Sequence, residues 1–176
     1  MSATPPDADD DAYGGVFGAF PYALRASESW LFKLYAVVGG VLAGLFTLLF
    51  AFSLVVLVAS TLGGRGGTFT FSRAFLLLIA LFVVGPTAAP ILLVARRLRR
   101  GESDDGYESA MAISGFLFLG SLYLGLLASI PPAQQRPVSG VLAPVVHTLY
   151  GLPPLAGLVP PLLAAALLLV VHRRLS

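Results

Sequence analysis

Four long apolar stretches without a charged side chain run through this sequence. They cover about residues 34–62, 74–95, 109–130 and 155–171. A helix rises about 1.5 Å per residue and needs roughly 20 mostly apolar residues to cross the ~30 Å hydrocarbon core of a bilayer. Each stretch reaches that range, the fourth only at its lower edge, and helices satisfy their own backbone groups in lipid. The sequence therefore predicts an all-α polytopic membrane protein, a bundle of four transmembrane helices.

Composition supports a membrane environment. Hydrophobic residues make up 57% of the chain and charged residues 11%, and the mean hydropathy is +0.87. Soluble domains carry about 25% charged residues. The net charge of +2 comes from cations in small clusters at the ends of the apolar stretches. That distribution is typical of membrane proteins, so we expect the lipid bilayer as a partner and no nucleic acid.

Two segments precede the first stretch. Residues 1–15 contain four aspartates and few apolar side chains, which predicts a disordered acidic tail. Residues 16–33 mix aromatic residues with small and charged ones, which predicts a juxtamembrane segment at the headgroup level, with Trp30 as an interface anchor. Ser27 or Ser29 is expected to cap the helix that follows.

The four-span membrane domain then covers residues 34–176. Within it, Val141–Tyr150 is apolar but too short to cross a bilayer, and Pro144 interrupts it. We expect a short interfacial or re-entrant segment at this place, before the fourth transmembrane helix.

The basic residues predict the orientation, because short cytoplasmic loops collect lysine and arginine. With both termini in the cytoplasm, eight basic residues lie on the cytoplasmic side and three on the other. The eight are Arg25, Lys33, Arg96, Arg97, Arg99, Arg100, Arg173 and Arg174, and the three are Arg65, Arg73 and Arg136. We therefore expect a multi-pass protein of the cell membrane with cytoplasmic N- and C-termini.

The densest basic cluster allows two interpretations. Four arginines lie between positions 96 and 100, directly after the second apolar stretch, and four acids follow between positions 102 and 108. The cluster can simply mark the cytoplasmic end of a helix. It can also bind anionic lipid headgroups, at about 1 kcal/mol per basic residue, although the four acids would weaken that attraction.

The sequence offers no chemistry for an enzyme. None of the four apolar stretches contains an ionisable side chain of the kind that proton relays and intramembrane ion sites require. Cysteine is absent, and His147 and His172 are the only histidines. Nucleophile-elbow and phosphate-loop patterns are also missing. We expect no catalytic residue, no cofactor, no metal site and no enzymatic activity.

Small residues recur at helical spacing in two of the stretches. The two sets are Ala36, Gly40 and Gly44 in the first, and Ser121, Gly125 and Ser129 in the third. Such faces let helix backbones approach closely in lipid. They predict either packing of the first stretch on the third, or binding of a second copy or a partner membrane protein. The leading functional hypothesis is a structural or accessory membrane module that binds a partner.

Prolines interrupt the second and fourth stretches. Pro86 and Pro90 remove amide donors, so the carbonyls of Phe82 and Pro86 lose their helical partners, and a kink is expected in the second helix. Thr87 is expected to bond a freed carbonyl. The run "LPPLAGLVPP" loosens the start of the fourth helix in a similar way. The alternative function is a small oligomeric permease or channel that uses these broken helices.

Three motifs carry a resemblance to a known group of proteins. They are "WLF" at residues 30–32, "TFTFSRAF" at 68–75 and "PPLAGLVPP" at 153–161. With them, most of the chain beyond about residue 14 resembles small four-span membrane proteins found in haloarchaea. The resemblance implies a four-span fold and an archaeal source. Since it brings no known activity, it implies no functional residues.

Overall fold

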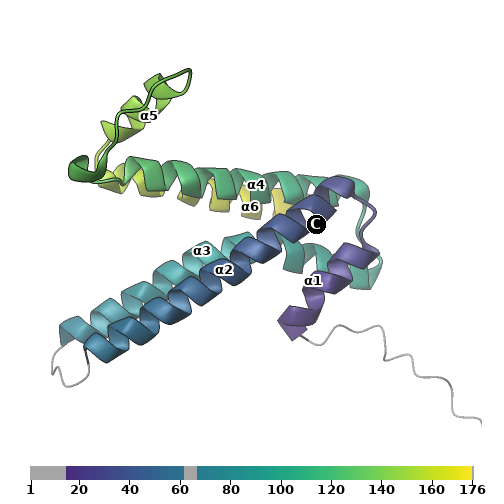
Figure 1. Ribbon diagram of the computed structural model, residues 1–176. Coiled ribbons are helices and arrows are strands. Elements are labelled where there is room, and N and C mark those ends of the chain that lie inside the picture. Colours follow the sequence, from purple (N-terminus) through teal and green to yellow (C-terminus); the bar gives the residue numbers. More distant parts are fainter. Residues whose placement is uncertain (1–14, 62–66, 176) are drawn as a thin grey trace, which may run out of the picture.

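A computed structural model describes residues 15–61 and 67–175 of the chain, and the predicted acidic tail lies almost wholly outside them. The described residues form helices and loops, without a strand (Figure 1). In chain order the elements are α1 (Gly15–Ala26), α2 (Trp30–Ser60), α3 (Gly67–Arg100), α4 (Asp105–Ala128), the short 3-10 helix η1 (Pro132–Gln134), α5 (Ala143–Tyr150), the 3-10 helix η2 (Pro154–Leu158) and α6 (Val159–Leu175). Within this part, four helical segments are long and apolar enough to cross a membrane: α2, α3, α4, and η2 with α6. The predicted fold class, an all-α polytopic bundle, is confirmed.

The helices extend beyond the predicted apolar stretches, because charged residues do not end a helix. α2 begins at Trp30 rather than Leu34, and α3 runs on to Arg100, where arginines stabilise the negative end of the helix dipole. α4 begins at Asp105, since the side chain of Asp104 caps it by accepting a hydrogen bond from the Tyr107 amide at 2.6 Å.

The predicted caps and the loosened fourth helix are also found. The Ser29 hydroxyl accepts from the Phe32 amide at 3.3 Å and caps α2, as expected for one of the two candidate serines. The last transmembrane segment starts as the 3-10 helix η2, within the proline-rich run, before it continues as α6.

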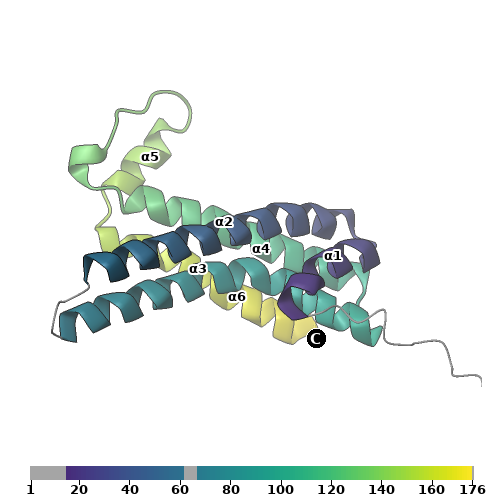
Figure 2. The same ribbon diagram turned by 60° about the horizontal axis from the view of Figure 1, so that its bottom comes forward.

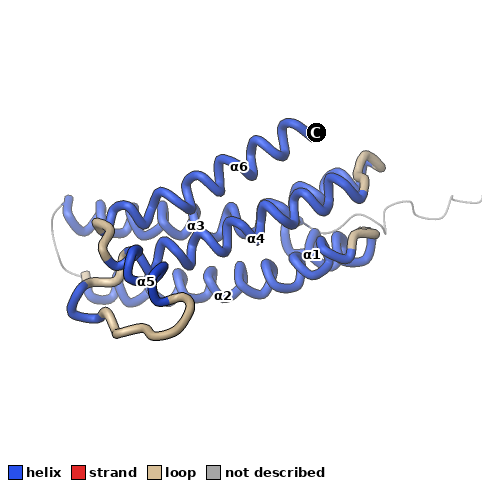
Figure 3. The backbone as a smooth tube through the Cα atoms, turned by 90° about the horizontal axis from the view of Figure 1, so that it is seen from above, coloured by secondary structure: helices blue, strands red, loops and turns tan. Residues whose placement is uncertain are grey.

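The transmembrane helices form two antiparallel pairs. α2 lies beside α3, and α4 lies beside α6. The pairs come together at the end of the bundle where the chain reaches Leu175, and they separate toward the opposite end (Figure 1). Seen from above, α4 lies between α6 and α2 (Figure 3).

The buried core sits at the end where the pairs meet. Its members are Ala19, Ala23, Phe32, Tyr35, Ala36, Ile91, Val94, Ala95, Tyr107, Met111, Ala112 and Leu168. They come from α1, α2, α3, α4 and α6, so five helices share one core. The buried positions of α2 stop at Ala43, whereas those of α4 continue to Ala128. α4 is therefore the central helix of the bundle.

Two shorter helices complete the fold. α1 covers the first half of the predicted juxtamembrane segment and packs on α2 and α3, where Ala19 and Ala23 are fully buried. α5 forms within the predicted short segment at 141–150 and stands off the bundle at the end opposite α1 (Figure 2). No residue of α5 is buried. Its position relative to the lipid, interfacial or re-entrant, stays a prediction.

Candidate functional site

Tyr35 joins three helices at the centre of the core. Its hydroxyl donates a hydrogen bond to the Thr87 carbonyl of α3 at 2.7 Å, and its ring meets Phe116 of α4 edge-on with centroids 5.0 Å apart. A Cβ atom added to Gly115 of α4 would collide with the same ring. Gly115 is therefore required here because the tyrosine ring occupies the space of a side chain.

Two prolines leave the Phe82 and Pro86 carbonyls of α3 without a helical amide donor. α3 remains helical through Pro86 and Pro90. The Thr87 hydroxyl donates to the Val83 carbonyl at 2.7 Å, so the prediction that it bonds the Phe82 or Pro86 carbonyl is wrong. The acceptor lies four residues back in the helix, within reach of a threonine hydroxyl. The Thr87 carbonyl takes its extra bond from Tyr35 instead.

A buried carboxylate closes the corner between α1, α2 and α4. Glu108 is only 3% exposed, in the first turn of α4. It accepts from the Ser27 hydroxyl at 2.5 Å, the Ser29 amide at 3.3 Å and the Ser103 hydroxyl at 3.0 Å. The Ser29 hydroxyl also shares a hydrogen bond with that of Ser109 at 2.9 Å. The network fixes the start of α4 against the start of α2.

Sequence reasoning missed this network. Glu108 lies one residue before the predicted stretch 109–130, in the group of four acids that we expect to weaken the attraction of the arginines for lipid headgroups. The available signal was the pair of serines at positions 27 and 29, two residues apart, for which the sequence predicts only a capping role. Burial of the carboxylate depends on the angle between α1 and α2, which the sequence does not reveal.

A second polar cluster ties the ends of α3, α4 and α6. The guanidinium of Arg97 lies 4.3 Å from the ring centroid of Tyr107, and its Nη1 donates to the Leu175 carbonyl at 2.6 Å. The Tyr107 hydroxyl and His172 Nδ1 share a hydrogen bond of 2.8 Å. His172 thus contacts the bundle, whereas His147 is exposed on α5.

The small-residue face of α4 packs within the chain. Gly125 approaches Gly157 of η2 so closely that a Cβ on either glycine would collide with the backbone of the other. The Ser129 hydroxyl donates to the Pro154 carbonyl at 3.2 Å, and Ser121 is buried on the same face. The expected packing of the first transmembrane helix on the third is found, since α2 contacts α4. The face formed by Ser121, Gly125 and Ser129, however, packs on the fourth, because the loosened η2 brings a glycine backbone against it.

The small-residue face of α2 is used only at one end. Ala36 is buried, and Gly40 lies against the Phe20 ring of α1. Gly44 has no atom near the position of an added Cβ. The face is therefore covered where the helix pairs meet and open where they separate.

Beyond the core, an apolar groove of about 560 Å³ follows α2 and α3, and we call it the α2–α3 groove. Its larger lining residues are Phe50, Leu54, Leu76, Leu77, Leu81, Val84 and Leu92, and its smaller ones are Thr47, Ala51, Ala80, Gly85 and Ala88. A Cβ at Gly85 would meet nothing within 4 Å. The Thr47 hydroxyl donates to the Ala43 carbonyl at 2.7 Å, so the groove presents no free hydroxyl proton there.

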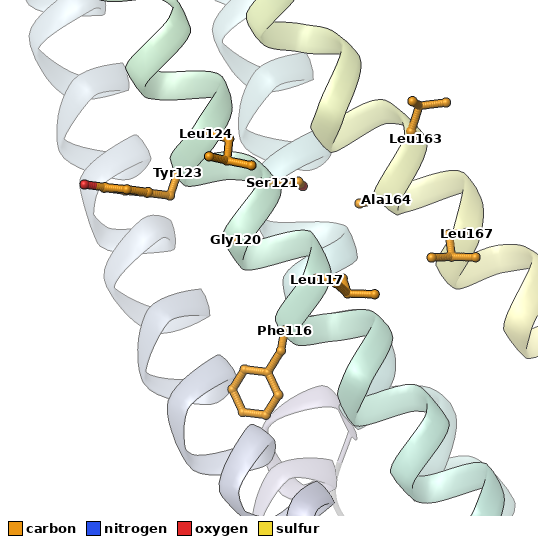
Figure 4. A pocket seen from close by; sticks show the side chains of 9 residues that line it. All are labelled: Phe116, Leu117, Gly120, Ser121, Tyr123, Leu124, Leu163, Ala164 and Leu167. Carbon is orange, nitrogen blue, oxygen red and sulfur yellow. The ribbon is translucent and has the colours of Figure 1, made fainter. Parts of the chain in front are cut away.

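A second groove of about 620 Å³ lies between α4 and α6 (Figure 4). Gly120, Ser121 and Ala164 are its small residues, and Figure 4 shows Leu163 and Leu167 on the α6 side. Ser121 donates its hydroxyl proton to the Phe118 carbonyl at 2.6 Å. This groove is also apolar, with fewer small residues than the first.

Neither groove carries a charged side chain. Among the residues that the structure describes, no group of three or more His, Asp or Glu side chains is placed to hold a metal ion. In the same part of the chain, every buried side-chain nitrogen or oxygen has a hydrogen-bond partner. The two grooves therefore offer a ligand their shape and apolar contacts.

Comparison with protein families places the whole chain in one group. Residues 2–176 match the family described as Domain of unknown function (DUF8056). The chain belongs to this family. The match covers α1, the four transmembrane segments and α5, so the DUF8056 unit includes both the core and the separated helix ends. No curated protein and no solved structure matches the chain. The haloarchaeal source stays a prediction.

Proposed function

We propose that this DUF8056 protein is a non-enzymatic membrane module that binds a transmembrane helix of a partner protein in the α2–α3 groove. The observation that carries the proposal is the set of small residues lining that groove, Thr47, Ala51, Ala80, Gly85 and Ala88, of which all but Ala88 are at least partly exposed. Apolar side chains facing lipid need no explanation, because lipid tails are equally apolar. Close packing of helices in lipid depends on small residues at the contact.

The dimensions of the groove fit a helix. On α3 it runs from Leu76 to Leu92. At about 1.5 Å per residue this is about 24 Å, most of the ~30 Å hydrocarbon core. An occupant of that length would run along the membrane normal. Because the groove lacks charge, the occupant should itself be an uncharged helix whose larger side chains fit over the small residues of α3 and α2.

The alternative, an oligomeric permease or channel, requires polar groups that face a solute path. In the described residues, the only side-chain hydroxyl of the proline-interrupted turn is bonded within the chain: the Thr87 hydroxyl donates to the Val83 carbonyl, and the Thr87 carbonyl accepts from Tyr35. This favours the binding module. The proposed orientation, with both termini cytoplasmic, applies to either function.

Photo-crosslinking in native membranes tests the proposal. A benzophenone amino acid at Ala80, inside the groove, should give a discrete protein adduct of the 18.4 kDa chain. The matched control is Leu78, which is 62% exposed and is not among the groove residues. It should give lipid adducts alone. Gly85→Leu should abolish the adduct at Ala80 without unfolding the protein, since Gly85 faces open space.

The adduct mass decides between the candidates. A mass that differs from any multiple of the chain's own supports a partner protein. An adduct of two or more copies, together with solute flux in liposomes, supports the pore instead. Lipid adducts alone at Ala80 would show that the groove is an ordinary lipid-facing surface.

A further inference from the structure

The ends of α3 and α6 bring two arginine clusters together. Arg97 of α3 reaches the Leu175 carbonyl at the end of α6, at 2.6 Å, and Tyr107 of α4 joins His172 of α6 at 2.8 Å. These contacts hold the two helix ends side by side. We call this region the arginine end; its exposed cations are Arg96, Arg99 and Arg100 of α3 and Arg173 and Arg174 of α6.

Two of the four acids that follow in sequence, Asp104 and Glu108, are engaged in hydrogen bonds. Glu108 is buried and accepts from Ser27, Ser29 and Ser103 on the side of the α1–α2 corner. An oxygen of Asp104 caps α4. Glu102, Asp104 and Asp105 remain exposed, so Glu108 alone among the four acids is withdrawn from the surface. Burial of Glu108 therefore reduces, by one charge, the weakening of the arginines' attraction that the sequence predicts.

The arginine end adjoins apolar surface. On α6, Leu169 and Val170 are about half exposed, and Arg173 and Arg174 follow within one turn. A ligand in this place meets exposed hydrocarbon below and guanidinium groups above. Guanidinium groups bind phosphate oxygens in a planar, two-pronged geometry. The chemistry that fits both surfaces is a phosphate with attached acyl chains.

We infer that the arginine end binds the phosphate headgroup of an anionic membrane lipid. Arg96 and Arg100 of α3 and Arg173 and Arg174 of α6 supply the positive charge. Arg97 is a positioning residue: its guanidinium is held by Tyr107 and Leu175, and it keeps the two helix ends together. This site is independent of the α2–α3 groove, which lies in the separated half of the bundle.

Purified protein in detergent micelles tests the inference. Micelles have no separate leaflets, so the orientation of the protein in the membrane does not affect which lipid reaches the arginine end. Native mass spectrometry would measure retention of added phosphatidylglycerol and of phosphatidylcholine. The protein should retain the anionic lipid preferentially. Replacing Arg96, Arg100, Arg173 and Arg174 by glutamine should weaken that retention at least about tenfold, since each basic residue near an anionic headgroup contributes roughly a fivefold effect.

Matched variants separate charge from folding. Lysine at the same four positions should restore most of the binding, because the positive charge is kept. Arg136→Gln, which removes an exposed arginine in the loop before α5, should leave the retention of phosphatidylglycerol unchanged. If the variant with all four arginines replaced by glutamine does not fold, the double variant Arg173→Gln/Arg174→Gln is used in its place, since it leaves α3 unchanged.

Equal retention of both lipids, or unchanged retention after neutralisation, would overturn the inference. Inorganic phosphate provides the last arm. If phosphate at millimolar concentration displaces the lipid fully, the site recognises free phosphate rather than lipid, and the inference also fails. Retention of the bound lipid in the presence of phosphate supports a site that binds both the headgroup and the acyl chains.

Discussion

At the arginine end, side chains from five helices fill one core. At the opposite end the two helix pairs separate (Figure 1), and large apolar side chains such as Phe52 and Leu126 are exposed. The difference is visible within single helices. In the most apolar window of α2, 6% of the residues are buried, against 39% in that of α4. The buried positions of α2 end at Ala43, and beyond it α2 runs beside α3, away from the other pair (Figure 1).

Polar contacts explain why the packed half is fixed and the other half is not. Hydrocarbon gives helices no hydrophobic reason to associate, so packing and hydrogen bonds must hold them. The contacts of Tyr35, Glu108 and Arg97 lie in the packed half. In the separated half, Arg73 joins α3 to Thr61 of α2 and leaves the other pair untouched. In the part of the chain that the structure describes, the hydrogen bonds that join the two helix pairs therefore lie in the packed half, which we call the structural base.

The largest expected effect comes from Gly115→Ala in the packed half. The added methyl group collides with the Tyr35 ring, which cannot move without losing its bond to Thr87. Overpacking of this kind costs about 3 kcal/mol of unfolding free energy. Denaturation in mixed micelles measures it. Gly120→Ala on the same helix meets nothing within 4 Å and is the control. Equal effects at both glycines would break the comparison.

Glu108→Ala should cost about 2 kcal/mol, because it removes the acceptor of three donors at a buried corner. The same denaturation experiment applies. Glu102→Ala, a nearby exposed acid, should stay within about 0.5 kcal/mol of the wild type. If Glu108→Ala changes the unfolding free energy as little as Glu102→Ala does, the corner between α1, α2 and α4 contributes nothing to the stability of the packed half.

Tyr35→Phe should cost about 1 kcal/mol, since it keeps the ring and removes one hydrogen bond to the Thr87 carbonyl. Tyr123, whose ring is 64% exposed on α4, provides the matched change Tyr123→Phe. The two variants differ only in the buried bond. A larger loss from Tyr123→Phe would mean that an exposed face is already engaged in the monomer.

The smallest effect is expected in the separated half. Gly44→Ala should stabilise the protein by about 0.5 kcal/mol, because alanine is the better helix former and the added methyl group meets nothing. Unfolding of the purified monomer checks the sign. A clear loss of stability would show that another helix already packs on Gly44, and that the separated half is closed.

The sequence was sufficient for the features that depend on local composition. Uncharged length predicted the four transmembrane helices, Ser29 was among the expected caps, and the proline-rich run predicted the weak start at η2. These depend on a few neighbouring residues and on the thickness of the bilayer. Helix ends were placed too early or too late because hydropathy changes sign at a charge, whereas a helix such as α3 continues through arginines.

Features that depend on the angles between helices could not be predicted. Small residues at positions 121, 125 and 129 identified a packing face, but only the structure shows that Gly157 lies against it. Likewise, the sequence groups Glu108 with the acids beside the arginine cluster, and its burial follows from the turn between α1 and α2. The α2–α3 groove arises from the separation of the two pairs, for which the sequence carries no local pattern.

The most direct test of this two-part account is a single-cysteine scan along α2. The natural chain has no cysteine, so each position from Phe32 to Ser60 can carry one spin label. Oxygen accessibility would be measured in phosphatidylcholine nanodiscs. The account predicts deep minima at Ala36, Gly39 and Ala43, and a much weaker helical period beyond Thr47. Minima of equal depth through to Ser60 would contradict it, because the bundle would then be closed along its whole length.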